Sequence, residues 1–528
     1  MNSTKVKKWG HLALAVIGIL GVLVAVTAAV SEPKIHLEPI GHYNTGIFDE
    51  GAAEIVAYDA GSQRLFVTNA NDGVVDVLDL SDPSSPALLH TIDLPEFSGG
   101  VNSVAVHDGL VAVAAENEEK TEPGQAVFLD VDGNLLSAVT VGALPDMVTF
   151  TPDGRYALIA NEGEPNDDYD VDPEGSVSII DLSGGVANLS QNNVHTASFS
   201  QFNNQRIDPL IRVFGPNATV AQDLEPEYIA VSDDSRLAWV TLQENNALAT
   251  IDIASAQVIS LQSFGLKDHS QPENALDVSN RDDVINITTW PVYGMYQPDA
   301  IAAFTIRGQQ YLITANEGDA RDYDGYSEEE RVKDLELDPT AFPDADTLQE
   351  DENLGRLTVT TAQGDLDGDG DFDAIWSFGA RSFSIWSRQG NLVYDSGNAL
   401  EQITAATLPE QFNSTNDEND SFDNRSDDKG PEPEGIAVGV INGRTYAFIG
   451  LERIGGIVVY DVTNPTSPQF VEYINTRDFS GDAEAGTAGD LAPEGLTFIP
   501  ASESPNGNAL LVVGYEVSGS VTIFNIGQ

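Results

Sequence analysis

The chain has 528 residues, and its 84 Asp and Glu outnumber its 24 Lys and Arg, which gives a formal net charge of −60. A field this negative repels phosphate backbones and argues against a nucleic-acid partner. Cys is absent, which excludes disulfides, thiolate zinc sites and a Cys nucleophile. Because the seven His are scattered, oxygen ligands are the expected metal chemistry, with Ca²⁺ favoured and Mg²⁺ as the alternative.

The first 30 residues have the pattern of a secretory signal peptide. Three lysines precede an apolar run over residues 12–26, and small residues end at Ala29. We predict a signal peptide over residues 1–29 and an extracytoplasmic protein that is periplasmic, secreted or attached to the cell surface. An uncleaved membrane anchor is the alternative, because residues 12–30 nearly reach the length of a membrane span. No other segment approaches that length.

Beyond residue 33, one pattern recurs along the chain and no linker interrupts it. Each copy has an alternating run, a turn with Gly, Asp or Asn, a second apolar run, an acidic turn, and a Gly followed by V-x-V-x-D. Three clear strands and a weaker fourth are typical of a propeller blade. We therefore predict an all-β fold, a single β-propeller over residues 33–528 with seven four-stranded blades, and six or eight blades as alternatives.

Seven copies of the pattern are clear, although the fifth is interrupted by an insertion. The segment 35–47 precedes the first copy and would supply the outermost strand of the last blade, which closes the ring. The copies are Ile55–Leu80, Val104–Val131, Val148–Leu182, Ile229–Ile253, Ile301–Trp386, Ile436–Val462 and Leu496–Ile526.

Carboxylates recur at two positions of this pattern, the start of the innermost strand and the turn between the second and third strands. Both positions lie on one face of a propeller, so we predict two acidic rings at one channel mouth. Like charges raise one another's pKa, and bound divalent cations would relieve the repulsion; a merely solvated acidic rim is the alternative. The strand-start carboxylates are Glu54, Asp146, Glu227, Asp299, Glu434 and Glu494, with Asn102 in copy two. The turn carboxylates are Glu116, Glu162, Glu244, Glu317, Glu452 and Glu516, with Asn71 nearest in copy one.

The most specific metal motif is an aspartate-rich loop, D-L-D-G-D-G-D-F-D, over residues 365–373. Its spacing matches a D-x-D-x-D-G calcium loop, in which the Gly at position six allows the sharp turn. The loop lacks the Glu at position 12 of an EF-hand, so we predict a hairpin tip between 356–361 and 374–378 with a structural role. A flexible acidic turn is the alternative. The candidate ligands are Asp365, Asp367, Asp369, Asp371 and Asp373.

Long insertions are expected to cap the acidic face, and a propeller with one elaborated face normally uses it to bind a ligand. They lie near 264–297, 318–379 and 399–430. Basic residues in and beside these insertions, next to clustered carboxylates, suit a phosphate that is held through a metal ion. Ion pairing within the rim is the alternative. The candidate phosphate contacts, if the chain is an enzyme, are Arg381, Arg425, Lys429 and Arg453.

Five stretches carry a resemblance to a known family. They are Val213–Ser232, Trp290–Phe304, Phe378–Trp386, Arg425–Gly435 and Gly450–Asp461. These stretches resemble the choice-of-anchor I proteins, a family that also includes the mesenchyme-specific cell-surface glycoproteins of biomineralising animals. The resemblance runs over essentially the whole mature chain and implies a secreted or surface propeller. Bacterial members are often labelled alkaline phosphatase.

Two function classes follow. The first is a calcium-binding propeller, secreted or exposed on the surface, that binds cations and an unknown ligand at an acidic channel mouth. Its expected partners are divalent cations and either a phosphorylated small molecule or a cell-surface partner. The alternative is a calcium-dependent phosphomonoesterase, in which a carboxylate-held cation cluster binds phosphate and activates water. A lactonase-type propeller with one channel calcium is a third interpretation.

Overall fold

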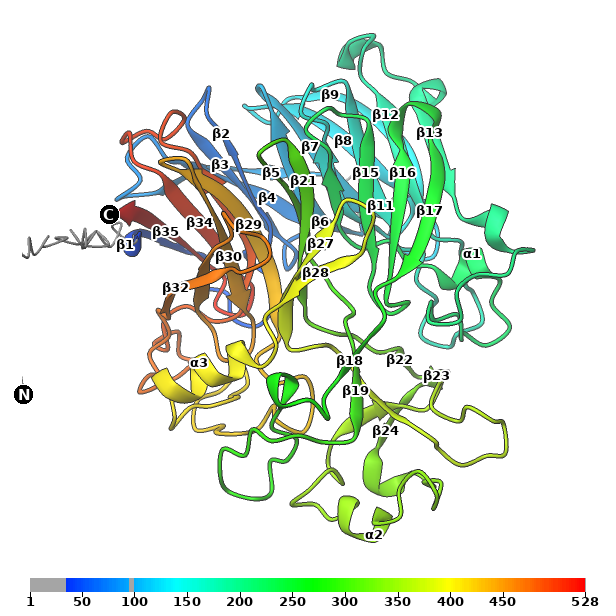
Figure 1. Cartoon of the computed structure of the whole chain (residues 1–528). Helices are drawn as coiled ribbons and strands as arrows, with labels where there is room; N and C mark the ends of the chain where they lie inside the picture. Colours follow the sequence, from blue (N-terminus) through cyan, green and yellow to red (C-terminus); the bar gives the residue numbers. More distant parts are fainter. Residues whose placement is uncertain (1–34, 95–98, 528) are drawn as a thin grey trace, which may run out of the picture. The chain divides into compact units, whose positions relative to one another are not determined.

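The computed structural model describes residues 35–94 and 99–527, and it is built almost entirely of β-strands (Figure 1). Seven four-stranded antiparallel sheets follow one another along this part of the chain. The predicted all-β propeller is therefore confirmed. The predicted signal peptide, residues 1–29, lies outside the described residues. Within 35–94 and 99–527, no helix is long and apolar enough to cross a membrane.

Each four-stranded sheet is called a blade here and numbered in chain order. Blade 1 contains β2 (Val56–Asp59), β3 (Arg64–Asn69), β4 (Val74–Asp79) and β5 (Ala87–Asp93). Blade 2 contains β6 (Gly100–His107), β7 (Leu110–Glu116), β8 (Pro123–Asp130) and β9 (Leu135–Ala143). Blade 3 contains β10 (Pro145–Phe150), β11 (Tyr156–Asn161), β12 (Ser176–Asp181) and β13 (Val194–Ser198). Blade 4 contains β14 (Ile229–Val231), β15 (Leu237–Leu242), β16 (Ala247–Asp252) and β17 (Gln257–Ser263).

The remaining three blades include the one that joins the two ends of the described chain. Blade 5 contains β20 (Ile301–Ile306), β21 (Gln309–Asn316), β27 (Ser382–Ser387) and β28 (Leu392–Asp395). Blade 6 contains β29 (Pro433–Ile441), β30 (Arg444–Leu451), β31 (Ile457–Asp461) and β32 (Gln469–Ile474). Blade 7 contains β33 (Pro493–Ile499), β34 (Leu510–Tyr515), β35 (Ser520–Gly527) and β1 (His36–Asn44).

The blades close into a ring through contacts between their innermost strands and through strand pairing at the outside of blade 7. The first strand of each blade contacts the first strand of the next, and β33 contacts β2. At the outside, β1 pairs antiparallel with β35, with Leu37 opposite Ile526. This is the role predicted for residues 35–47, and it joins the N-terminal part of the described chain to its last strand.

The core lies between neighbouring blades. Each pair of adjacent blades shares one cluster of buried apolar side chains, and the cluster between blades 7 and 1 completes the circle. The middle strands are covered on both faces, so they read as continuous apolar runs such as the LVAVAA of β7. The outermost strands are much less buried, and Leu88 and Leu89 of β5 are exposed.

Two of the insertions fold together into a separate five-stranded sheet outside the blades, at the lower end of Figure 1. Its strands, in order, are β18 (Leu266–Asp268), β19 (Val292–Met295), β26 (Ile375–Ser377), β25 (Thr358–Thr360) and β24 (Glu329–Arg331). A small hairpin adds β22 (Asp322–Tyr323) and β23 (Tyr326–Ser327). The α-helices are α1 (Val220–Asp223), α2 (Ala345–Leu348) and α3 (Ala399–Thr407). Within the described residues, the 3-10 helices are Val186–Asn188, Gln191–Asn193, Ser200–Phe202, Ile253–Ser255, Pro272–Asn274 and Val332–Asp334.

Buried ion pairs tie the insertions to the propeller. Arg321 is buried and pairs with Asp223 and Glu225, which precede blade 4. Arg212 pairs with Glu328 in the same manner. A buried charge is stable only when it is paired, so these contacts hold the insertion in one place on the propeller.

Candidate functional site

The strand-start carboxylates lie where the innermost strands are irregular. In three blades the register between the first and second strands shifts directly after a proline, at Pro145, Pro433 and Pro493. Such β-bulges turn a side chain away from its regular direction, and they are common beside binding sites. The next residue in each case is the carboxylate, Asp146, Glu434 or Glu494.

Glycine in the recurring Pro-Glu-Gly sequence allows neighbouring blades to approach closely. A Cβ on Gly435 would lie 1.8 Å from the carbonyl oxygen of Glu494, and one on Gly495 would lie 2.3 Å from that of Glu54. Any side chain there would push the innermost strands apart. The glycines therefore keep the carboxylates of successive blades close to the channel axis.

The turn carboxylates are held beside the strand starts by a recurring backbone hydrogen bond. In three blades the amide of the turn glutamate donates to the carbonyl of the residue before the strand-start proline, at 2.8 to 2.9 Å. That preceding residue has a left-handed backbone, with φ between 44 and 59°, which strains any residue other than glycine. The pairs are Glu162 with Leu144, Glu452 with Glu432 and Glu516 with Ala492.

Five of the six strand-start carboxylates line one cavity of ≈ 150 Å³ at the centre of the ring. Its polar lining also includes Asn102, Gln243 and Glu317, and Leu496 is among the apolar side chains of its wall. Glu54 is not among the lining residues, although its neighbour Ile55 is. The lining carboxylates are Asp146, Glu227, Asp299, Glu434 and Glu494.

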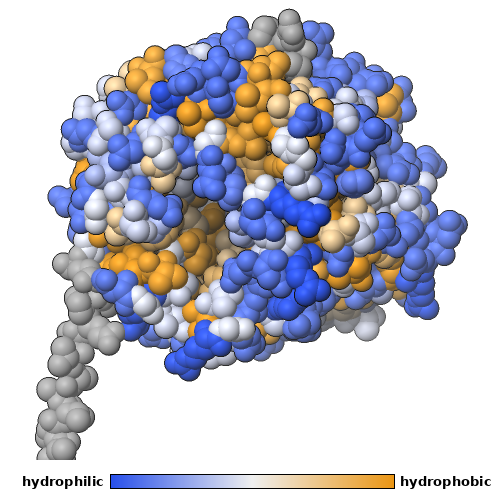
Figure 2. Space-filling model, turned by 90° about the horizontal axis from the view of Figure 1, so that it is seen from above, coloured by the Kyte–Doolittle hydropathy of each residue, from blue (hydrophilic) through white to orange (hydrophobic). Residues whose placement is uncertain are grey.

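The opposite end of the propeller, away from the insertions, is hollowed at its centre, and most of the surface around the hollow is hydrophilic (Figure 2).

The acidic cavity itself is lined by the starts of the innermost strands. Those starts lie at the same end as the turn carboxylates, because the backbone bonds described above join them. The cavity therefore lies at the end that the insertions cover, as predicted.

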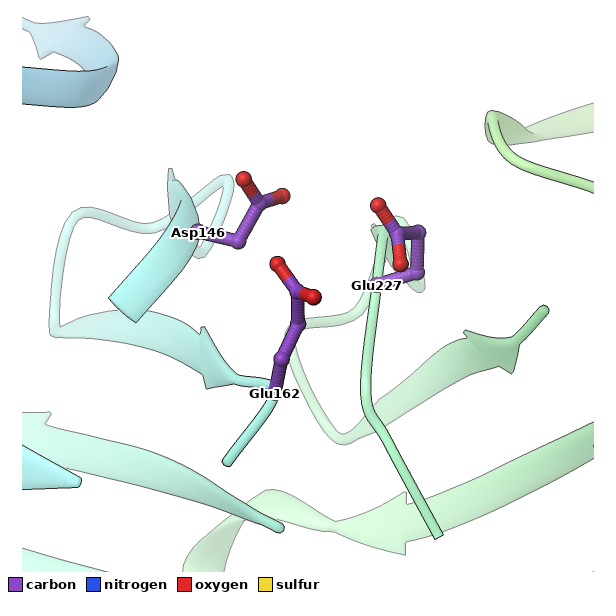
Figure 3. Close-up of side chains that lie close together, drawn as sticks. All are labelled: Asp146, Glu162 and Glu227. Atoms are coloured by element: carbon purple, nitrogen blue, oxygen red, sulfur yellow. The ribbon is translucent and has the colours of Figure 1, made fainter. Parts of the chain in front are cut away.

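Three groups of three carboxylates in this region bring one oxygen of each residue within 4.8 Å of the others, and two of the groups repeat one arrangement. The third group contains Glu317, Glu432 and Glu452. Triad A contains Asp146, Glu162 and Glu227, whose carboxylates point toward one another (Figure 3). Triad B contains Asp299, Glu317 and Glu434. Each triad takes the strand-start and turn carboxylates of one blade, blade 3 or blade 5, and the strand-start carboxylate of the next.

Burial and mutual repulsion oppose ionisation of these groups. Burial, followed by repulsion from other carboxylates, raises the pKa of Asp146 to about 7 and that of Glu54 to about 8. The same causes raise the pKa of Glu227 and Asp299 well above the ordinary range. The cavity therefore holds either protons or cations at neutral pH.

Some carboxylate oxygens of the site have no protein partner. One oxygen each of Glu434 and Glu494 is buried and accepts no hydrogen bond from a described residue. One oxygen of Glu244, a turn carboxylate, is likewise buried and accepts no hydrogen bond from a described residue, and Glu244 is 4% exposed. Buried polar atoms in native proteins nearly always have a partner, so a bound ion or water is expected there.

Three of the four predicted phosphate contacts converge on one carboxylate, Glu432. The distances to its oxygens are 2.7 Å from Arg425 Nη2, 3.2 Å from Lys429 Nζ and 3.0 Å from Arg453 Nε. Burial opposes ionisation of Glu432, yet Lys429 and the two arginines lower its pKa to about 2. Glu432 was not among the predicted residues, because it lies outside the repeating positions; its place directly before Pro433 was the available signal.

The fourth predicted phosphate contact, Arg381, lies beneath helix α3. Its guanidinium is buried, pairs with Glu401 at 2.7 Å and donates to the carbonyl oxygens of Asp277 and Ser426. Neither Arg381 nor the three residues around Glu432 are among those that line the cavity. All four are held by carboxylates of the chain itself.

The aspartate-rich loop lies between β25 and β26, which pair antiparallel through Val359 and Ser377, so the predicted hairpin is confirmed. The amides of Gly368 and Gly370 donate to Asp365, which curls the loop. Two carboxylate groups form, and they share Asp373. They are Asp365, Asp367 and Asp373, and Asp338, Asp371 and Asp373. Asp338 was missed because it reaches the loop only through the parallel bridge between Leu337 and Phe372.

Comparisons with solved structures give distant likenesses over nearly the whole chain. Hydrazine synthase of Kuenenia stuttgartiensis has a TM-score of 0.46 at 12% identity, over 92% of this chain and 99% of that chain. The β-propeller domain of Cps50 (Swd1) of Myceliophteria thermophila has a TM-score of 0.43 at 8% identity, over 92% of this chain and 99% of that chain. No functional argument follows from either.

Two curated relatives are similar in sequence. Gigasin-3a of Magallana gigas is 34% identical over 191 residues, which are 34% of this chain and 67% of that protein. The mesenchyme-specific cell surface glycoprotein of Strongylocentrotus purpuratus is 26% identical over 292 residues, which are 49% of this chain and 37% of that protein. The matched part of the chain thus spans little more than a third of the glycoprotein's length.

The sequence profile of the choice-of-anchor I domain matches residues 54–465. The match begins at the strand-start carboxylate of blade 1 and ends just beyond the third strand of blade 6. It includes both carboxylate triads, Glu432 and the aspartate-rich loop. Since this match covers most of the chain, the protein belongs to the choice-of-anchor I family.

Proposed function

We propose that this protein is a surface-exposed or secreted propeller that binds divalent cations, Ca²⁺ above all, in its central acidic cavity. The observation that carries the proposal is the convergence of five strand-start carboxylates on one cavity of ≈ 150 Å³. Hard oxygen ligands without Cys or His favour Ca²⁺ or Mg²⁺ over transition metals. The extracytoplasmic location is supported by the family and by a relative named as a cell surface glycoprotein.

Calcium is expected to raise the melting temperature of the chelator-treated protein, because it binds the folded state alone. At a free concentration about 100 times the Kd, the stabilisation amounts to about 2.7 kcal/mol. Replacing Asp146 by Asn together with Glu227 by Gln removes two cavity ligands and should abolish most of this shift. The measurement is a thermal melt with and without calcium.

The matched control for this experiment carries Asp93→Asn and Glu484→Gln, which remove the same charge from exposed positions. The control should keep the full calcium shift. If the cavity variant keeps it as well, calcium binds elsewhere and the proposal is wrong.

The aspartate-rich loop is proposed as a second, structural calcium site. Replacing Asp367, a member of the first carboxylate group, and Asp369, a ligand predicted from the sequence, by Ala alters a site that is exposed and distant in sequence from the cavity. We expect the calcium content after dialysis to fall by about one ion per chain. The rise in melting temperature that calcium binding in the cavity causes should remain. Asp346→Ala with Glu352→Ala, in the same insertion, is the control and should change nothing. An unchanged calcium content in the loop variant would show that the loop is only an acidic turn.

A calcium-dependent phosphomonoesterase is the alternative function. One observation favours it: Lys429 Nζ lies 3.2 Å from Glu317 of the cavity, so a cation stands beside the carboxylates. Against it, Lys429, Arg425 and Arg453 are all paired with Glu432. The test is hydrolysis of p-nitrophenyl phosphate after chelation and after addition of calcium. Turnover that depends on calcium and falls in Arg453→Ala would establish the enzyme, and no turnover in either condition would remove it.

A further inference from the structure

Triads A and B are two copies of one arrangement. In both, the strand-start and turn carboxylates come from one blade and the third carboxylate from the start of the next blade. The sequences that supply the turn carboxylates are also alike, Asn-Glu-Gly-Glu over 161–164 and Asn-Glu-Gly-Asp over 316–319. A difference in what surrounds the two triads therefore indicates a difference in what they bind.

Triad A has no counter-charge within the described chain. Glu162 is 8% exposed, points at the other two carboxylates (Figure 3) and takes part in no hydrogen bond or ion pair through its side chain with a described residue. The nearby Lys120 pairs instead with Glu164, at 3.1 Å. A buried carboxylate of this kind, aimed at two others, is stable only when it is protonated or paired with a cation.

One member of triad B, Glu317, already has a cation from the chain itself, whereas one buried oxygen of Glu434 has no partner among the described residues. Lys429 Nζ lies 3.2 Å from one oxygen of Glu317, and the amide of Gln243 donates to the other at 2.9 Å. The ammonium is held in place by the carbonyl oxygen of Gly318 at 2.7 Å and by Glu432 at 3.2 Å. Glu317 therefore has both of its oxygens satisfied, in contrast to its counterpart Glu162.

We propose that triad A holds one tightly bound divalent cation and that the ammonium of Lys429 takes the place of a second cation at triad B. This inference rests on the proposed function and assigns the cation to a specific place within the acidic region. The geometry suits calcium, because two oxygens bound to one Ca²⁺ at about 2.4 Å lie at most about 4.8 Å apart. The oxygens of triad A meet that limit.

The inference is tested by counting calcium ions with titration calorimetry. The chelator-treated protein carries Asp367→Ala and Asp369→Ala, so that the aspartate-rich loop does not contribute, and CaCl₂ is the titrant. We expect one tight site. Glu162→Gln should weaken it by at least about tenfold, since a ligand is lost, whereas the equivalent Glu317→Gln should weaken it less, because Glu317 is not a ligand of that ion. This matched pair differs only in which triad it touches.

Removing the ammonium supplies the second test. Lys429→Met should raise the number of sites from one to two, because Glu317 then lacks its cation, and Lys120→Met should leave the number at one. If Lys429→Met fails to fold, the Glu162 and Glu317 pair still decides the assignment. A site that keeps its affinity in Glu162→Gln, or loses as much affinity in Glu317→Gln, would overturn the inference and leave calcium binding by the cavity intact. No calcium binding in any of these proteins would overturn the proposed function itself.

Discussion

Replacing Arg321 by Ala is expected to lower the free energy of unfolding by about 3–5 kcal/mol. The guanidinium is fully buried, pairs with Asp223 and with Glu225 at 2.8 Å, and lies over the ring of Phe214 at 4.6 Å. Removing it leaves two carboxylates without their cation in a region of low dielectric constant, and it also removes packing. The insertion that carries Arg321 would then lose part of its attachment to the segment before blade 4, while the ion pair between Arg212 and Glu328 would remain.

Urea denaturation followed by tryptophan fluorescence measures this loss. The control is Arg206→Ala, because Arg206 is exposed and a change there should stay within about 0.5 kcal/mol. Both proteins are measured in saturating calcium, so that the cavity contributes equally. A loss for Arg321→Ala as small as that of the control would mean that the insertion does not depend on this pair.

In the presence of a chelator, the free energy of unfolding is expected to fall as the pH rises from about 5 to about 9. Burial and carboxylate repulsion raise the pKa of Asp146 to about 7, and burial first, with repulsion from neighbouring carboxylates, raises those of Glu54 and Glu244 to about 8. Unfolded carboxyl groups titrate near pH 4, so the folded state binds more protons between about pH 4 and 8. The stability that these protons contribute is complete below about pH 4 and is lost as the pH passes through 7 to 8.

The expected size of this fall is several kcal/mol, since each unit of pKa difference corresponds to about 1.4 kcal/mol per group. Glu432 does not contribute within this range: its pKa is lowered to about 2, so its stabilising effect is already complete above about pH 4.5. Calcium should flatten the pH dependence, because a bound cation replaces the protons in the acidic region.

Urea unfolding at pH 5, 7 and 9, with chelator and with calcium, checks this expectation. Glu54→Gln with Glu244→Gln should reduce the slope in chelator, because neither amide titrates. Equal stability of the chelator-treated protein at pH 5 and pH 9 would contradict the burial of these carboxyl groups in a common low-dielectric region.

The fold was predictable from the sequence because a propeller repeats local signals. The sequence of each blade contains its own strand and turn patterns. The copies beginning at Ile55 and Val104 therefore predict the same blade structure independently. The closing strand 35–47 was predictable for the same reason, since the last copy lacked an outer strand and β1 supplies it. The hairpin around the aspartate-rich loop followed from the turn chemistry of the loop itself.

The sequence by itself also determined which positions carry carboxylates, because the proline, the acid and the glycine at each strand start act locally, through a bulge and a close backbone approach. Only the tertiary structure decided how these carboxylates group. Glu162 and Glu227 meet because two blades pack side by side, and Lys429 reaches Glu317 across 112 residues of sequence. Ion pairing depends on distances of a few ångströms between segments far apart in the chain, and a repeat pattern does not contain those distances.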